Sequence, residues 1–143
     1  RHIRFAQKPR DLERRERSIA RNIGTGEFDT AIQRGFEFYR ANFFKENGAP
    51  KYFHDRTYPI DAHCVAQSII TLLEFRDMDA GSIDMAEKVY NWAMENLWDS
   101  EGYFYYQVQP VYKNRISYMR WTQAWMLLAL AKLLEQLINV SNQ

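Results

Sequence analysis

The chain has 143 residues, of which 46% are hydrophobic, 26% are charged and 15% are aromatic, and its formal net charge is +1. This composition excludes an intrinsically disordered chain, and the length is that of one globular domain. The single cysteine, Cys64, excludes an internal disulfide framework and a cysteine-based zinc site. It favours a reducing compartment, so we expect a cytoplasmic protein, or a periplasmic one if an N-terminal region has been removed.

The N-terminal segment differs from the rest in charge. Residues 1–21 carry eight basic and three acidic side chains. Because the arginines interleave with Asp11, Glu13 and Glu16, we expect no nucleic-acid partner. Residues 1–24 are predicted to form a basic helix or a linker, and residues 25–143 the folded part. The longest apolar run, residues 124–131, is too short to span a bilayer, so we expect no membrane insertion.

Hydrophobic periodicity predicts four helices. The first covers residues 27–44 and ends before Asn47-Gly48, and the second covers residues 59–75 with Pro59 in its first turn. The third begins at Ser82, which could act as its cap, and stops at Asp99. The fourth covers residues 117–138. Because its middle is apolar around nearly the whole circumference, we expect it to be an inner helix buried among others.

The two halves of the chain resemble each other. The stretch FFKENGAPKYF…YPIDAHCVAQSIITLL aligns with LWDSEGYFYY…YMRWTQAWMLLALAKLL, so that Gly48 matches Gly102 and Tyr58 matches Tyr118. Each unit has an amphipathic outer helix, an aromatic loop with a glycine, and a more apolar inner helix. Such repeats predict an all-α fold of stacked helical hairpins, each of which buries its apolar face on a neighbour.

This pattern is similar to that of the α/α toroids, in which six or seven helical hairpins form two concentric rings. The segment GYFYYQ…SYMRWTQAWMLLALAKLL resembles the C-terminal part of bacterial toroid proteins associated with polysaccharide biosynthesis. Those proteins are related to six-hairpin glycosidase-like enzymes such as unsaturated glucuronyl hydrolases and N-acylglucosamine 2-epimerases. The resemblance covers residues 27–135. It implies a partial (α/α) toroid over residues 25–143, with a short aromatic β-hairpin or loop between the last two helices.

A closed ring of six such hairpins needs on the order of 300 residues, whereas this chain supplies two. The resemblance therefore implies a C-terminal portion, which a second chain or a missing N-terminal toroid half would complete. It also implies an oligosaccharide or polysaccharide partner and a hydrolase, lyase or epimerase-like activity. The alternative is a non-catalytic helical-repeat scaffold or protein-interaction module, and whether the chain is an enzyme stays open.

In a toroid, the loops that enter the inner helices line one cleft. We expect Tyr103, Tyr105 and Trp121 to offer ring faces to a sugar there. The alternative for the aromatic loop is a small β-hairpin that packs Phe104 and its alternate neighbours on the helix ends.

The stretch HDRTYPIDAH concentrates titratable groups at the start of the second predicted helix, which is the first of the two inner helices. Asp61 lies near that helix start, where the dipole favours a carboxylate, and is the candidate base, with His63 or Asp55 as the proton donor and His54 as a substrate contact. Alternatively, Asp61 only satisfies backbone donors. Since the histidine spacing matches no zinc motif, we expect neither a metal nor another cofactor.

Arg120 opens the last helix, and its guanidinium could hold a uronate carboxylate through two hydrogen bonds. The alternative is a structural ion pair with an acid such as Asp61, Asp99 or Glu101. Cys64 and Trp125 are expected to be core residues rather than reactive or sugar-binding ones.

Overall fold

The computed structural model describes residues 26–141, and the predicted basic segment 1–24 lies outside them. The chain divides into two compact units, Arg1–Gly35 and Phe36–Gln143. Helix α2 (Gly26–Asn42) crosses this boundary.

The described residues are mostly helical. Besides α2, they form α3 (Ala62–Glu74), α4 (Ser82–Asn96) and α5 (Ala124–Ser141), and a π-helical turn, η1 (Met119–Gln123), precedes α5. The four helices predicted from periodicity are therefore confirmed. Among the described residues, no helix is both long enough and apolar enough to cross a membrane.

The start of the second predicted helix is wrong by three residues. Pro59 does not lie in a first helical turn, because Ile60–Asp61 form the short strand β1, and α3 begins only at Ala62. Strand β1 pairs antiparallel with β4 (Gln107–Val108), which keeps its backbone extended. Asp61 accordingly has φ −108° and ψ 161° and is the N-cap of α3.

Two small antiparallel sheets occupy the connections between helices. One has the order β1-β4-β5, with β5 at Lys113–Asn114, and the other pairs β2 (Trp98–Asp99) with β3 (Tyr103–Phe104). The predicted hairpin is confirmed in part: β4 pairs antiparallel with β5, and Phe104 and Val108 are buried, but β3 and β4 belong to different sheets. The chain turns between them, so that both Phe104 and Tyr105 are buried.

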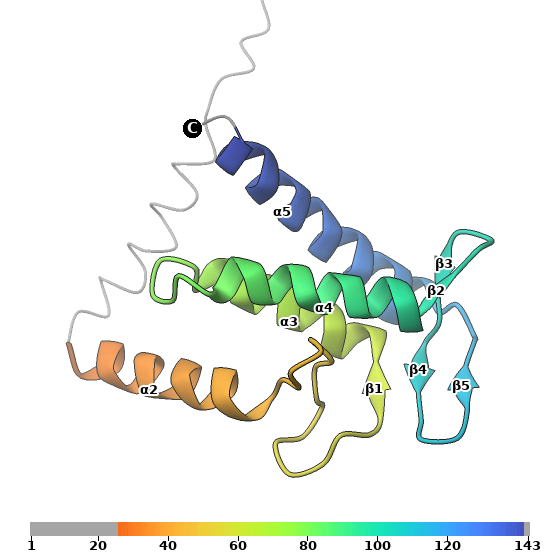
Figure 1. The fold of residues 1–143 in the computed structure, drawn as a ribbon, viewed down its shortest axis with the longest axis horizontal. Coiled ribbons are helices and arrows are strands. Elements are labelled where there is room, and N and C mark those ends of the chain that lie inside the picture. The colour runs from red at the N-terminus through yellow and green to blue at the C-terminus, as the bar shows by residue number, and fades with distance from the viewer. Residues whose placement is uncertain (1–25, 142–143) are drawn as a thin grey trace, which may run out of the picture. The chain divides into compact units, whose positions relative to one another are not determined.

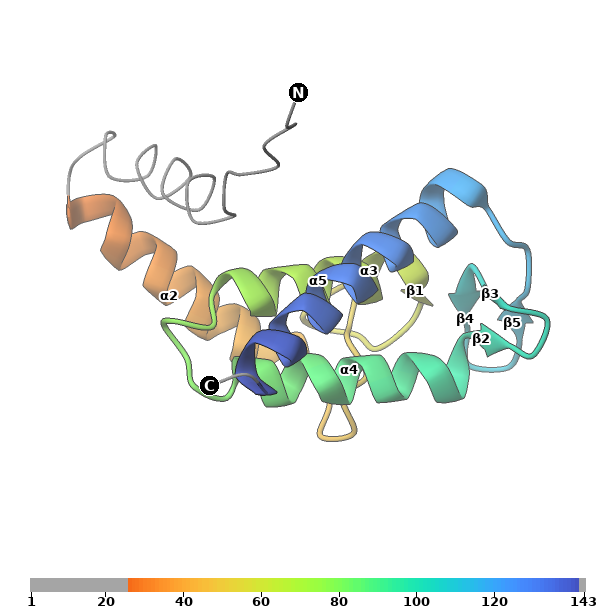
Figure 2. The ribbon, with the colours of Figure 1, turned by 90° about the horizontal axis from the view of Figure 1, so that it is seen from above.

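Helix α3 is the centre of the core and packs against both α4 and α5 (Figures 1 and 2). Its buried side chains recur at helical spacing, and alanines on the neighbouring helices leave room for them. The fully buried members of this core include Val65, Ile69, Leu72, Ala86, Val89, Ala93, Met126 and Ala129.

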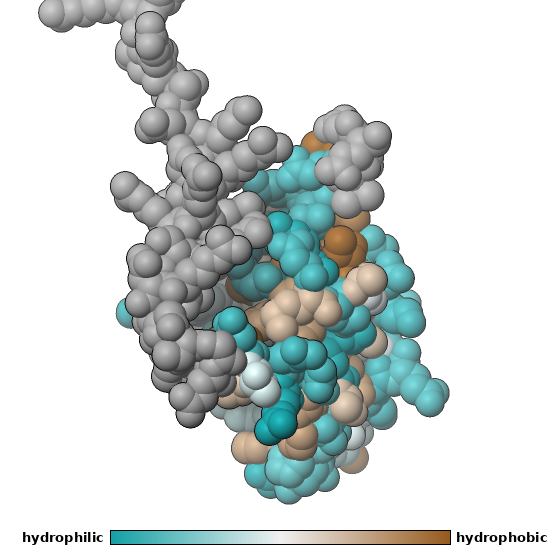
Figure 3. Space-filling model, turned by 90° about the vertical axis from the view of Figure 1, so that its left-hand side faces the viewer, coloured by the Kyte–Doolittle hydropathy of each residue, from teal (hydrophilic) through white to brown (hydrophobic). Residues whose placement is uncertain are grey.

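Helix α5 was predicted to be buried on all sides, and this is wrong for the described residues. Its inner face carries Met126, Ala129 and Leu133 into the core, but on the opposite face Leu127 is 70% exposed and Leu134 is also exposed. No described element lies along that face (Figure 1). Figure 3 shows that hydrophilic residues predominate among the coloured atoms on another side of the molecule, with apolar areas between them.

The internal repeat is visible in the backbone hydrogen bonds. After each outer helix the chain makes the same two bonds, first back to the helix and then across a glycine turn. After the first outer helix they are Phe43 N–H to Tyr39 O (2.9 Å) and Lys51 N–H to Phe43 O (2.7 Å). After the second outer helix they are Leu97 N–H to Ala93 O (2.8 Å) and Tyr105 N–H to Leu97 O (2.7 Å). Gly48 and Gly102 have φ values of +85° and +93°. The two connections are thus built on one plan.

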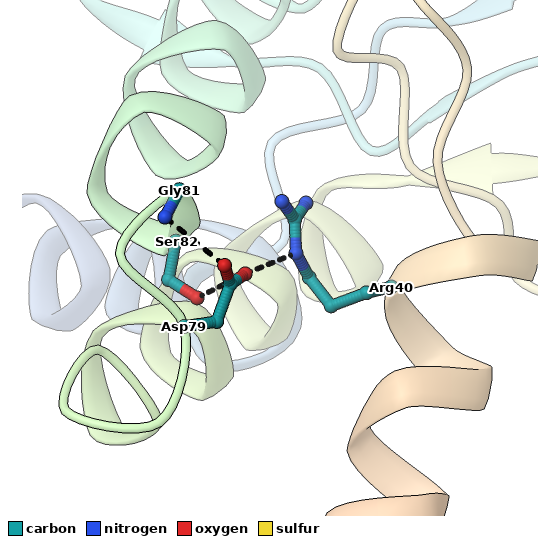
Figure 4. A network of polar contacts seen from close by, with 4 residues as sticks. All are labelled: Arg40, Asp79, Gly81 and Ser82. Carbon is teal, nitrogen blue, oxygen red and sulfur yellow. Dashed lines mark hydrogen bonds and ion pairs between the residues drawn. The ribbon is translucent and has the colours of Figure 1, made fainter.

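The turn between α3 and α4 is held by Asp79 (Figure 4). Its carboxylate accepts the Gly81 N–H at 3.0 Å, the Ser82 hydroxyl at 3.0 Å and the Arg40 Nε at 2.7 Å. Ser82 was predicted to cap α4, whereas Gly81 is the N-cap and makes no side-chain capping bond. The Ser82 hydroxyl instead donates to Asp79, which carries the polar contacts of this helix start.

Candidate functional site

The two connections that precede the inner helices meet at one end of the molecule. We call this region, residues 43–61 and 97–123, the loop end. Strand β1 of the first connection pairs with β4 of the second, with Ile60 opposite Val108, and the Ala62 N–H donates to the Tyr106 oxygen at 2.9 Å. Figure 1 shows the five strands gathered where α3 and α5 begin. The strand pairing therefore brings the two loops together, while the cleft that they were expected to line stays a prediction.

Asp61 lies at the junction of the two connections. It is only 8% exposed, and its Oδ1 accepts the Cys64 N–H at 2.6 Å. Burial raises the pKa of the neighbouring Tyr106 phenol, and the charges of Asp61, Tyr118 and Tyr52 act in the same direction. The Asp61 carboxylate thus satisfies a backbone donor of α3 and also borders a group of tyrosines.

His63 and Cys64, in the first turn of α3, face different surroundings. The His63 ring lies 4.8 Å from that of Trp125, at 48°, and so joins α3 to α5. Burial, reinforced by the Asp61 charge, raises the pKa of the Cys64 thiol to about 12. A thiol with such a pKa stays protonated at neutral pH and is a poor nucleophile. His63 and Asp61 make no hydrogen bond or ion pair with each other in the described part of the chain.

A second acidic centre forms around Asp99 at the end of α4. The Tyr105 hydroxyl donates to Asp99 Oδ2 at 2.6 Å, and the Glu101 N–H donates to Oδ1 at 2.8 Å. These two bonds, with the positive charge of Arg115, lower the pKa of Asp99. The same hydrogen bond raises the pKa of Tyr105, whose ring lies 5.3 Å from the Arg115 guanidinium. Asp99 and Tyr105 thus form a hydrogen-bonded acid and phenol, with the Arg115 cation beside the Tyr105 ring.

The predicted platform tyrosines differ in what they can offer a ligand. Tyr105 is only 8% exposed, since its hydroxyl is bound by Asp99 and its N–H by Leu97. Tyr103 is half-buried, and its ring meets that of Tyr105 edge-on at 5.9 Å. Tyr103 therefore has the more accessible ring of the two.

Arg120 and Trp121 lie in η1 and are exposed; Trp121 is 62% exposed. Arg120 makes no ion pair with Asp61, Asp99 or Glu101, and no other described residue bonds to its side chain. The alternative of a structural ion pair is thus wrong within the described residues.

His54 and Asp55 lie in a separate turn of the first connection, closed by a bridge between Phe53 and Arg56. Both are exposed, and the His54 ring lies 5.9 Å from that of Phe38. Neither makes a hydrogen bond or ion pair with Asp61 across the described part of the structure. Asp61 and Asp55 are therefore not joined as a bonded pair.

Two contributors were missed by the sequence reasoning. Arg115 follows no periodic pattern, and only its position among aromatic residues could have pointed to it. Gln123 anchors β3 to η1, because its side-chain amide accepts the Phe104 N–H at 3.0 Å and donates to the Phe104 oxygen at 2.7 Å. A glutamine at a helix start carries no signal for such a long-range contact.

Over the described residues, no three His, Cys, Asp or Glu side chains are grouped so that they could hold a metal ion. No protein-family model matches the chain, and neither a curated protein nor a solved structure matches it.

Proposed function

We propose that the chain binds carbohydrate at the loop end, as a segment of an α/α toroid in bacterial polysaccharide metabolism. One observation carries this proposal. Among the described residues seven aromatic side chains are exposed, and six of them belong to the loop end: Tyr52, Tyr58, Trp98, Tyr112, Tyr118 and Trp121. Exposed rings are costly in water, and sugar C–H faces pack well on them while phenol hydroxyls meet sugar hydroxyls.

Polar groups at the same end supply the complementary chemistry. The exposed Arg120 guanidinium suits a uronate carboxylate, and Arg115 with Asp99 offers a donor and an acceptor beside the Tyr103 ring. The duplicated hydrogen bonds of the two connections support the toroid, because a toroid repeats this unit around a ring.

A catalytic role is a further part of the proposal. Hydrolysis, elimination or epimerisation would use Asp61 as base through Oδ2, since Oδ1 already accepts the Cys64 N–H. His63 or Asp55 would donate the proton. A sugar would have to reach Asp61 beside Tyr106, whose pKa the carboxylate helps to raise.

The test is a titration with uronate-containing and N-acetylated oligosaccharides, followed by tryptophan fluorescence. We expect saturable quenching by one sugar class and at least a roughly tenfold loss of affinity in Trp121→Ala. Arg120→Ala should weaken the binding of uronate-containing oligosaccharides and leave the binding of N-acetylated ones unchanged. The matched control, Arg34→Ala, removes an exposed arginine from α2 and should change nothing. Absence of quenching by any sugar, with folded protein, would contradict the proposal.

The second candidate function is a helical-repeat scaffold that binds protein. The exposed apolar face of α5 favours it, because such faces mark protein contacts. In that case the rings of the loop end would serve as interface anchors, and none of the sugars would bind.

A further inference from the structure

The outer face of α5 forms a continuous apolar stripe. Leu127, Leu134 and Ile138 recur at intervals of one or two helical turns, with Trp121 and Leu128 beside them and Ala124 and Ala131 between them. The five large side chains are 44% to 70% exposed. We propose that this stripe is a homodimer interface, in which α5 packs antiparallel against α5 of a second copy about a two-fold axis.

The exposed apolar area is sufficient for such an interface. The five large side chains expose on the order of 500 Å² per protomer, which is at the upper end of what monomers leave uncovered. Twice this area approaches the lower limit for specific protein interfaces, so we expect a micromolar rather than a permanent dimer. Since the opposite face of α5 fills the core, dimerisation would not require the fold to change.

Charge complementarity selects a second copy as the occupant. Two charged residues lie beside the stripe without an ion-pair partner among the described residues, Arg120 near its start and Glu135 near its end. Lys132, the other cation of α5, is paired with Glu74. A two-fold axis between Leu127 and Leu128 places Arg120 of each copy opposite Glu135 of the other. Both ion pairs then form at once.

The same register also matches the side-chain sizes. Trp121 lies opposite Leu134, and Ala124 lies opposite Ala131. Small residues between large ones allow two helix backbones to approach closely, so the leucines of one copy can fill the spaces beside the alanines of the other. A parallel arrangement would instead bring Arg120 to Arg120 and Glu135 to Glu135. The antiparallel register is therefore the favoured one.

The test is the mass of the whole chain in solution, by sedimentation velocity from about 5 to about 200 μM. We expect the mass to rise toward twice 17.1 kDa over this range. Leu127→Glu, at the centre of the stripe, should leave a monomer at every concentration. Met78→Glu changes an equally hydrophobic exposed residue outside α5 and should dimerise like the wild type. Far-UV circular dichroism checks that each variant is folded.

Charge reversal tests the register. Arg120→Glu and Glu135→Arg should each weaken dimerisation roughly tenfold, and the double variant should restore it, because the pairs are re-formed with opposite sign. A wild-type chain that stays monomeric, a Leu127→Glu chain that still dimerises, or a double variant that is not restored would overturn the proposal. Leu127 is not among the proposed sugar contacts, so Leu127→Glu separates this proposal from carbohydrate binding. Arg120 and Trp121 belong to both proposals, so a sugar bound by these two side chains should favour the monomer.

Discussion

The matched glycines of the two connections offer a sensitive test of the packing. Both have positive φ, which costs an L-residue about 1–2 kcal/mol. Their surroundings differ. A Cβ on Gly48 would lie 2.5 Å from the Lys88 backbone oxygen, whereas a Cβ on Gly102 would meet nothing within 4 Å. Gly102→Ala should therefore destabilise by about 1–2 kcal/mol, and Gly48→Ala by a further 1–3 kcal/mol or so, because the backbone of α4 must move.

Thermal unfolding followed by far-UV circular dichroism measures the stability of both variants. At this chain length, about 1 kcal/mol corresponds to roughly 3 °C in Tm, so the two alanine variants should differ by several degrees. If the two substitutions cost the same, the close approach of the first connection to α4 is not what requires glycine at position 48. A Gly48→Ala variant as stable as the wild type would refute the conformational argument as well.

Three further predictions concern single side chains. Asp79→Asn should destabilise by about 1–2 kcal/mol at neutral pH. The amide keeps one acceptor oxygen for the Gly81 N–H, but it lacks the charge and the second oxygen that accept from Ser82 and Arg40. Burial opposes ionisation of Asp79, but these bonds outweigh burial and lower the pKa of Asp79 below 3.8. The stability that comes from ionisation is therefore present above pH 3.8 and is lost as the pH falls through the lower pKa of the folded state. In that pH range, the unfolding free energies of wild type and variant from urea titrations should converge. Thr122→Val should be neutral or stabilise by up to about 1 kcal/mol, because Thr122 Oγ1 is the one buried side-chain polar atom without a hydrogen-bond partner among the described residues; a loss above about 1 kcal/mol in thermal unfolding would show that the hydroxyl is satisfied. Cys64, whose pKa is raised to about 12, should react with iodoacetamide far more slowly in folded protein than in urea, and equal rates by mass spectrometry would contradict the raised pKa.

Several elements could be predicted from the chain alone because their causes are local. The four helices follow from the spacing of apolar residues, and the two turns follow from glycines that take positive φ. The correspondence of Gly48 and Gly102 also predicted that the two connections share one plan, which their hydrogen bonds confirm. The assignment of sugar-binding and catalytic roles stays a prediction.

Other features depend on contacts between distant segments, which no local pattern reports. Strand β4 pairs with Ile60–Asp61, and this pairing delays the start of α3 and makes Asp61 its cap. Tyr105 was expected to face a ligand, yet Asp99 and Leu97 hold it in the core. Periodicity reports how apolar a helix surface is, but only the packing of α3 against one side of α5 decides which of its apolar side chains are covered. The same sequence feature therefore predicted a buried helix, while the tertiary structure leaves Leu127 and its neighbours exposed, because the described chain supplies α5 with partners on one face only.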